Sequence, residues 1–188
     1  SMASRSRHDD GPARVSCAAT RTGSPGPPVT DGHVIIIGGA EDKVRDRVIL
    51  SRFATLAGGR DATVAVISTA SSLGLEAGER YKQVLGELGV ARVRTIHAVT
   101  RSQANDETAA LAIRDATGIF MTGGNQLRLS STIGGTRLAD AVLDQFRRGA
   151  VVAGTSAGAS AMSSHMIAFG ASGATPKQPI IGSSGSSR

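Results

Sequence analysis

The chain has 188 residues, of which 40% are hydrophobic and 24 are glycine, so we expect one sizeable core and a single α/β domain rather than two. Its net charge of +6 comes almost wholly from arginine, with only three lysines among the 21 basic residues. These arginines are scattered along the chain, which argues against a nucleic-acid groove and leaves attraction of an anionic substrate open.

Three further classes of interaction are not expected. The single cysteine, Cys17, excludes a disulfide framework and is compatible with a reducing, cytoplasmic location. No run approaches the roughly 18 apolar residues that span a bilayer, so no membrane partner is expected. No group of histidine, cysteine and carboxylate residues has the spacing of a metal site, so we expect neither a metal nor another cofactor.

Both ends have the composition of irregular chain. Residues 1–30 mix charges with prolines and lack the apolar region of a secretory signal, which predicts a disordered leader. Residues 171–188 are rich in glycine and serine, which predicts an irregular tail without a final strand or helix. The folded core is therefore expected within residues 31–170.

The core alternates between two hydrophobic periods. It begins with Val34–Ile37, a continuous apolar run typical of a strand buried on both faces, and then changes to helical spacing. Because parallel strands need crossover connections, the repeated alternation predicts a mostly parallel sheet with helices on both faces. Strands are predicted at residues 34–37, 63–67, 93–96, 118–121 and 151–153, and helices at residues 44–56, 81–88, 105–113 and 136–146.

Glycine-rich loops follow three of the predicted strands, at residues 38–43, 122–126 and 154–158. Ligands of parallel sheets bind beyond the carboxyl ends of the strands, so these loops are expected to converge on one site. The first loop has Lys43 where a dinucleotide fingerprint needs its third glycine, which favours a structural turn over a nucleotide site. The glycines at 123–124 either present N–H groups to an oxyanion or relieve strain where the strand ends.

Ser156 lies in a Gly-x-Ser-x-Gly turn between an apolar strand and a helix of small residues, a setting typical of a nucleophile. The alternatives are a serine that caps the helix and a loop that cradles phosphate. A serine nucleophile also needs a base. His165 is nine residues further along what is predicted to be the same helix, about 13 Å from the turn, so it is not expected to be that base. His33 and His97 lie at strand boundaries and match no catalytic pattern.

Four segments together carry a family resemblance: residues 34–43, 120–129, 152–161 and 164–167. In this order they resemble the motifs of the cyanophycinases, the dipeptidase E-like enzymes of peptidase family S51. The resemblance implies a fold similar to class I glutamine amidotransferases, of flavodoxin-like type. It also implies a serine-type, carboxypeptidase-like exopeptidase that hydrolyses cyanophycin, a polyaspartate with arginine on each side-chain carboxyl, to β-aspartyl-arginine dipeptides.

The family motifs imply roles for particular residues of this sequence. Ser156 matches the nucleophile, and the amides of Gly124 and Ala157 match the donors of the oxyanion hole. Gln126 matches a glutamine associated with substrate binding, and Arg128 and Ser130 are further candidates for that pocket. The implied partner is cyanophycin or an isoaspartyl peptide, and the residues do not decide between the two.

The sequence also departs from the family pattern. Family members continue into an Asp-Gln-His-Phe motif that supplies the catalytic histidine, and no counterpart of this motif follows Ala171. We therefore expect a truncated, impaired enzyme with an unpaired sheet edge, and association into a homodimer is left open. The sequence leaves three alternative functions open: an isoaspartyl or α-aspartyl dipeptidase, an α/β-hydrolase-like esterase, and a non-catalytic amidotransferase-like binding module. The esterase is disfavoured because its usual His-Gly-Gly-Gly segment is missing.

Overall fold

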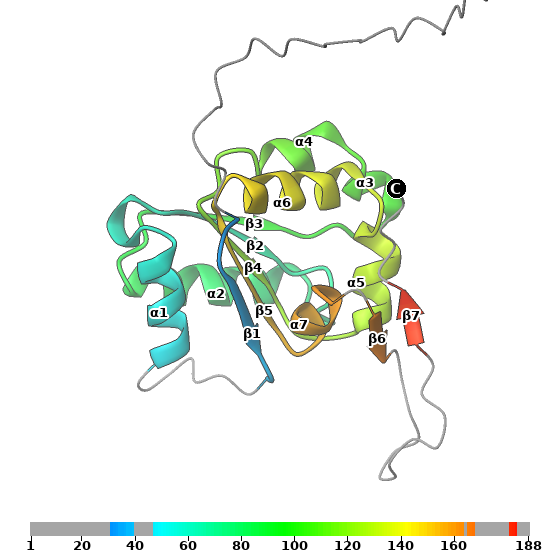
Figure 1. The fold of residues 1–188 in the computed structure, drawn as a ribbon, viewed down its shortest axis with the longest axis horizontal. Coiled ribbons are helices and arrows are strands. Elements are labelled where there is room, and N and C mark those ends of the chain that lie inside the picture. Colours follow the sequence, from blue (N-terminus) through cyan, green and yellow to red (C-terminus); the bar gives the residue numbers. More distant parts are fainter. Residues whose placement is uncertain (1–30, 40–46, 164, 168–180, 184–188) are drawn as a thin grey trace, which may run out of the picture.

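The computed structural model describes residues 31–39, 47–163, 165–167 and 181–183, and these build a five-stranded sheet with helices on both faces (Figure 1). All neighbouring strands of the sheet are parallel, in the order β1-β5-β4-β2-β3. The strands are β1 (Val34–Ile37), β2 (Thr63–Ile67), β3 (Arg92–Ile96), β4 (Gly118–Met121) and β5 (Val151–Thr155). The predicted parallel α/β architecture is confirmed.

The helices divide between the two faces. Two long helices after β1 and β2 cover one face, and the helices from α3 onward cover the other (Figure 1). Their bounds are α1 (Val48–Leu56), α2 (Leu75–Glu87), α3 (Arg101–Ala104), α4 (Glu107–Leu111), α5 (Gln126–Ile133), α6 (Arg137–Arg147) and α7 (Ala157–Ala161), with a short 3-10 turn at Gly59–Asp61. Among the described helices none is long and apolar enough to cross a membrane.

The inner strands supply both cores because their side chains alternate between the faces. Along β4, Phe120 packs into the cluster under α1 and α2, while Ile119 packs into the cluster on the opposite face. Phe120 meets Phe53 and Tyr81 with ring centroids 5.5 Å and 4.6 Å apart. The aromatic contacts fix α1 and α2 on the sheet, and α2 in turn lines the site described below.

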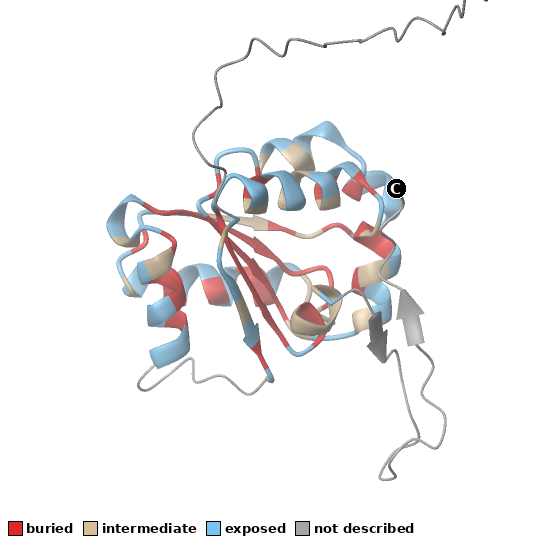
Figure 2. Cartoon of the chain, viewed as in Figure 1, coloured by how far each residue is buried: buried red, intermediate tan, exposed pale blue. Residues whose placement is uncertain are grey.

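The first strand differs from the prediction that it is buried on both faces. It is an edge strand paired only with β5 in the described sheet, and Val34 and Ile36 are 50% and 72% exposed. Figure 2 shows the contrast between this pale strand and the buried inner strands. A continuous apolar run therefore marks β1 as a strand without saying how many neighbours it has.

Two helical predictions also need correction. The helix α5 was not predicted at all, although Asn125 caps it by accepting a hydrogen bond from the Arg128 N–H at 2.9 Å. The helix after Ser156 ends at Ala161, so the prediction that His165 continues it is wrong. His165 instead begins β6 (His165–Ile167), which pairs antiparallel with β7 (Ile181–Ser183). The Ser156 carbonyl accepts from both the N–H and the hydroxyl of Ser160, at 2.9 Å and 3.2 Å, and such side-chain bonding slightly destabilises a helix.

Only some of the predicted domain limits fall on residues that the structure describes. The leader at 1–30 lies outside the described residues, as do Glu41, Asp42 and Lys43 of the first glycine loop. The tail predicted to be irregular at 171–188 contains the strand β7, so it is not wholly irregular. The boundaries themselves stay predictions.

Candidate active site

A cavity of about 310 Å³ lies at the carboxyl edge of the sheet, where the connections from β2 and β4 leave in opposite directions. Such a switch point is the usual ligand crevice of an open parallel sheet. Its lining residues follow β1, β2 or β4, end or follow β5, or lie on α2: Gly39, Ser71, Leu73, Ala77, Arg80, Tyr81, Thr122, Gly123, Thr155 and Ser156. The expected convergence of the three glycine loops is therefore seen in the part of them that is described.

Ser156 sits on a strained turn at the end of β5. Its φ of 50° and ψ of −110° are unusual for a residue with a side chain, and such a conformation costs on the order of 1–3 kcal/mol. Two backbone hydrogen bonds hold it: the Ser156 N–H donates to the Ile37 carbonyl at 2.9 Å, and its carbonyl accepts from the Ser160 N–H at 2.9 Å. The turn leaves the serine exposed at the cavity while its neighbours Thr155 and Ala157 are buried.

Close backbone packing explains the glycines on either side of this serine. A methyl group built on Gly154 would lie 2.4 Å from the carbonyl carbon of Gly158, and one built on Gly158 would lie 2.3 Å from the Met121 oxygen. Real Cβ atoms essentially never approach backbone so closely. The two glycines thus let α7 start directly against β4 and β5, which fixes where Ser156 stands.

The other two glycine loops meet Ser156 at short range. A Cβ built on Gly39 would lie 3.6 Å from the Ser156 Cβ, and one built on Gly123 would lie 3.4 Å from it. Gly124 has a different place: its φ is 142°, and a Cβ there would lie 2.1 Å from the Ala70 carbonyl oxygen. Gly123 therefore borders the serine, while Gly124 lets its loop pack on the loop after β2.

The remaining residues chosen from the family motifs lie on α5 and α7, the helices that follow two of the glycine loops. Ala157 begins α7, and the N–H groups of a first helical turn have no acceptor within the helix. Gln126 begins α5, and Arg128 on the same helix donates to the carbonyl oxygen of the lining residue Ser71 at 3.4 Å. The Ser130 hydroxyl donates to the Leu127 carbonyl of its own helix at 3.3 Å. Neither Gln126, Arg128 nor Ser130 is among the described residues that line the cavity.

Several lining residues were missed from the sequence. Ala77, Arg80 and Tyr81 have the i, i+3, i+4 spacing that places them on one face of α2, so the helical periodicity held a signal for them. Thr122 directly follows β4 and is only 1% exposed, yet its hydroxyl finds no hydrogen-bond partner in the described chain. A buried hydroxyl without a partner is costly, which makes Thr122 a candidate contact for a bound ligand.

Few charged side chains are found among the described residues around Ser156. Arg80 is the one charged side chain among the described lining residues, and no imidazole or carboxylate is among them. Histidine and serine do meet elsewhere: Ser68 Oγ lies 3.1 Å from His97 Nδ1. His97 follows β3, three strand positions from β5, on the order of 14 Å away at the usual strand spacing. Neither Ser68 nor His97 is among the described residues that line the cavity.

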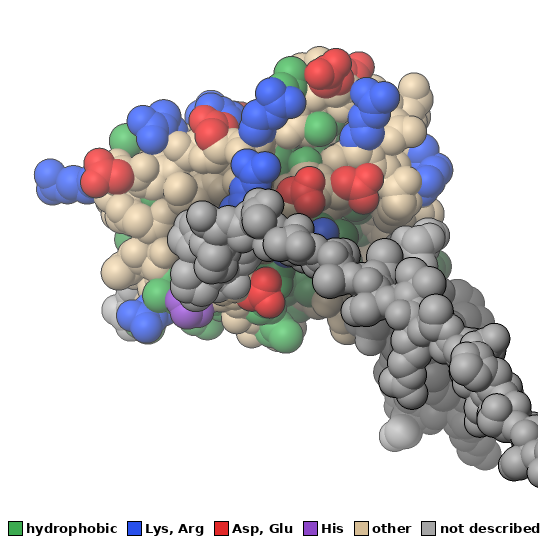
Figure 3. Space-filling model, turned by 45° about the horizontal axis from the view of Figure 1, so that its top comes forward, with side chains coloured by type: hydrophobic (Ala, Val, Ile, Leu, Met, Phe, Trp, Pro, Cys, Tyr) green, Lys and Arg blue, Asp and Glu red, His purple; other side chains and the backbone are tan. Residues whose placement is uncertain are grey.

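A second hollow, of about 510 Å³, lies along α2 and is lined by exposed charged and polar side chains. It contains no serine, and only Arg80 belongs to both hollows. On the face drawn in Figure 3 the arginines and lysines are spread among acidic side chains, as the scattered sequence positions indicate. Among the described residues no three histidine, cysteine or carboxylate side chains are grouped as metal ligands would be.

The model of peptidase family S51 matches residues 34–185. The cyanophycinases of Geminocystis herdmanii (strain PCC 6308) and Synechococcus elongatus are each 40% identical to this chain, over 149 and 151 residues. These matches cover 79% and 80% of this chain but 55% and 47% of the relatives. The chain thus spans about half the length of these curated relatives.

Two solved structures share the fold. The crystal structure of a peptidase from an acI-B1 actinobacterium has a TM-score of 0.64 at 23% identity, covering 72% of this chain and 58% of that one. A putative peptidase E protein from Listeria monocytogenes EGD-e has a TM-score of 0.55 at 22% identity, covering 73% and 64%. Because the family model spans most of the sequence, the resemblance of its motifs is confirmed and the chain belongs to peptidase family S51.

Proposed function

We propose that this chain carries the nucleophile of a serine exopeptidase that degrades cyanophycin. In the proposed reaction Ser156 Oγ attacks a main-chain aspartyl carbonyl, and its proton passes through a base to the departing amine. Water then hydrolyses the acyl-enzyme and releases β-aspartyl-arginine. The N–H groups of Gly124 and Ala157 are the proposed donors to the oxyanion, and such donors contribute about 10²–10³ in kcat.

The observation that carries this proposal is the strained turn of Ser156 at a cavity bordered by two glycine loops. A serine with a φ of 50° between Gly154 and Gly158 is held away from the sheet, as a nucleophile must be. The alternative of a serine that only caps α7 is weakened, because its side chain makes no capping hydrogen bond there.

The substrate is proposed from the relatives, which are named cyanophycinases. Gln126, Arg128 and Ser130 on α5 are the proposed contacts for the part of the substrate beyond the cavity. The cytoplasm is the proposed location, and a homodimer through the β1 edge is the proposed assembly.

We further propose that the 188-residue chain by itself is a slow enzyme. The described wall of the cavity offers Ser156 neither an imidazole nor a carboxylate, and loss of the base leaves only residual catalysis from the oxyanion hole and binding.

A fluorophosphonate probe with peptide mass spectrometry tests the nucleophile. We expect labelling of Ser156 that disappears in Ser156→Ala and persists in Ser71→Ala, the matched change of a second serine in the same cavity. Clearing of cyanophycin granules and chromatography of the products then test the reaction. Labelling of Ser71 instead, or unchanged labelling in Ser156→Ala, would rule out the assigned role.

Two other activities are distinguished by the same assays. Cleavage of isoaspartyl or α-aspartyl dipeptides without release of β-aspartyl-arginine from the polymer would identify a dipeptidase. The absence of a described base at the cavity favours a second candidate, a non-catalytic binding module, in which the glycine loops hold a ligand. Ligand binding without labelling or turnover would identify that module.

A further inference from the structure

Arg80 is the charged side chain that the described residues offer to the cavity of Ser156. It reaches the cavity from α2, on the helix face that also carries Ala77 and Tyr81. The rest of the described lining is apolar, glycine or uncharged polar. A single cation in such a setting favours a ligand that brings one negative group to this wall.

The present partner of Arg80 does not hold it firmly. Arg80 Nη2 lies 3.1 Å from Glu76 Oε1, and the two side chains are 56% and 67% exposed. Exposed pairs within one helix contribute little because water screens them. A substrate carboxylate can therefore replace Glu76 as the acceptor, or share the guanidinium with it, at little cost.

A second observation indicates that the same cavity awaits a polar ligand. The Thr122 hydroxyl is buried in its wall and has no hydrogen-bond partner in the described chain. Burying such a group is unfavourable unless something satisfies it when the site is filled. Arg80 on α2 and Thr122 in the loop after β4 thus offer a charged and a neutral donor to one ligand.

We propose that Arg80 is a specificity-determining residue that binds a carboxylate of the substrate in the Ser156 cavity. This inference rests on the proposed function, because the β-aspartyl-arginine unit carries the carboxylates in question, one on its aspartyl part and one on its arginine. Guanidinium and carboxylate match in shape and charge, which gives specificity as well as affinity.

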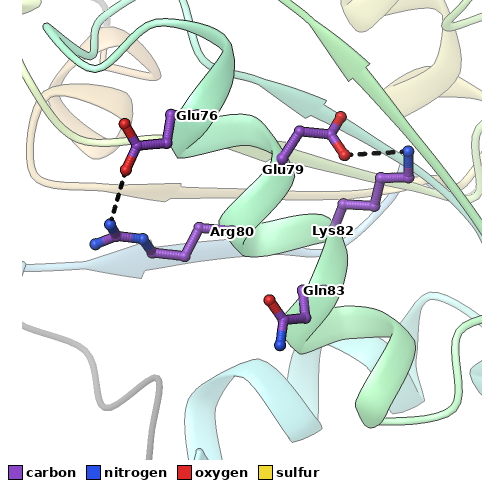
Figure 4. Close-up of a pocket in the computed structure, with 5 residues that line it drawn as sticks. All are labelled: Glu76, Glu79, Arg80, Lys82 and Gln83. Atoms are coloured by element: carbon purple, nitrogen blue, oxygen red, sulfur yellow. Dashed lines mark hydrogen bonds and ion pairs between the residues drawn. The ribbon is translucent and has the colours of Figure 1, made fainter.

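The chain provides a matched control on the same helix. Lys82 is also cationic, is 48% exposed and pairs with Glu79 at 3.2 Å, but it lines only the second hollow along α2 and not the Ser156 cavity. Figure 4 shows Glu76 and Arg80 pointing to one side of α2 while Glu79 and Lys82 point to the other. Removing Lys82 changes the net charge as much as removing Arg80 and leaves the cavity wall intact.

Titration calorimetry with the full chain carrying Ser156→Ala, which prevents turnover, tests the proposal. Three ligands are compared: β-aspartyl-arginine, β-aspartyl-agmatine, which lacks the arginine carboxylate, and the analogue with an amide in place of the aspartyl carboxylate. We expect one of the two analogues, each of which lacks one carboxylate, to bind about tenfold more weakly than β-aspartyl-arginine, and that analogue identifies the carboxylate. Adding Arg80→Ala should abolish this preference, Arg80→Lys should keep part of it, and Lys82→Ala should keep all of it.

Three results would overturn the inference. The first is that the Ser156→Ala chain binds none of the ligands or binds all three equally well. The second is that its preference for the carboxylate survives Arg80→Ala, and the third is that Lys82→Ala reduces that preference as much as Arg80→Ala does. Hydrolysis of cyanophycin by the wild-type chain is measured in parallel. Hydrolysis of cyanophycin, together with a ligand preference that Arg80→Ala leaves unchanged, refutes the role of Arg80 and leaves the proposed peptidase activity standing. An Arg80-dependent preference, with hydrolysis by the wild-type chain no faster than by Ser156→Ala, refutes the proposed peptidase activity alone.

Discussion

Gly158→Ala is the change for which the structure gives the clearest energetic expectation. The added methyl would lie 2.3 Å from the backbone oxygen of Met121 and 2.8 Å from its carbonyl carbon. Met121 ends β4, which is hydrogen-bonded to a strand on each side, so its carbonyl has little room to retreat. The clash must therefore be relieved by moving the start of α7, which carries Ser156.

The magnitude follows from two opposing contributions. Overpacking by one methyl costs about 1–3 kcal/mol. Replacing a helical glycine by alanine recovers at most about 0.5–1 kcal/mol. We expect a net loss of about 1–2 kcal/mol in the free energy of unfolding. For a chain of this length that lowers Tm by about 2–8 °C.

Gly86→Ala is the matched control. Gly86 lies in α2, and nothing lies within 4 Å of the place its Cβ would take. The helix preference alone should act there and raise Tm by about 1–4 °C. Thermal unfolding followed by circular dichroism measures both variants, and the rate of fluorophosphonate labelling reports whether Ser156 has moved. If Gly158→Ala were as stable as the wild-type chain and labelled at the same rate, the steric account of this motif would be wrong.

Two further predictions concern the edge and the surface. Ile36→Glu on β1 should leave the fold intact, because the side chain is 72% exposed, and should reduce concentration-dependent association in sedimentation velocity; identical sedimentation of both chains would contradict this. Two hydrogen bonds from the Arg94 guanidinium lower the pKa of the Asp115 carboxyl below its ordinary 3.8. The ionised carboxylate therefore stabilises the fold above about pH 4, and this stabilisation is lost as the pH falls through the lowered pKa. Asp115→Asn should therefore lose up to about 1 kcal/mol at pH 7 and progressively less in acid, measured by urea unfolding, whereas a loss independent of pH would point to packing instead.

The inner part of the fold could be predicted from the sequence because burial on both faces leaves a plain signature. The predicted limits 63–67 and 118–121 are those of β2 and β4. The α5 helix left a weaker signature: only Leu129, Thr132 and Ile133 are buried, and glycine pairs flank it. Its capping by Asn125 depends on a local hydrogen bond that periodicity does not reveal.

From the sequence, only the part of the candidate site that lies in the glycine-rich motifs could be predicted. Gly123 and Gly124 look equivalent in the sequence, and their different roles follow from the loop after β2, which lies against one of them. Arg80 belongs to a segment that no glycine loop marks, and it joins the cavity because α2 packs on Phe120 through Tyr81. Such a residue is brought to the site by tertiary packing.

The conformation of Ser156 depends both on its sequence motif and on tertiary packing. Its positive φ is sustained by contacts from three strands: the Ile37 carbonyl of β1, the Met121 carbonyl of β4 against Gly158, and the end of β5 itself. The contacts from β1 and β4 come from residues far from the Gly-x-Ser-x-Gly turn in sequence, so the motif adopts this conformation only in the assembled sheet. It follows that disturbing β1, an exposed edge strand, should alter Ser156 although the two are more than a hundred residues apart in sequence. The reactivity of this serine is therefore a direct measure of whether the sheet edge is correctly formed.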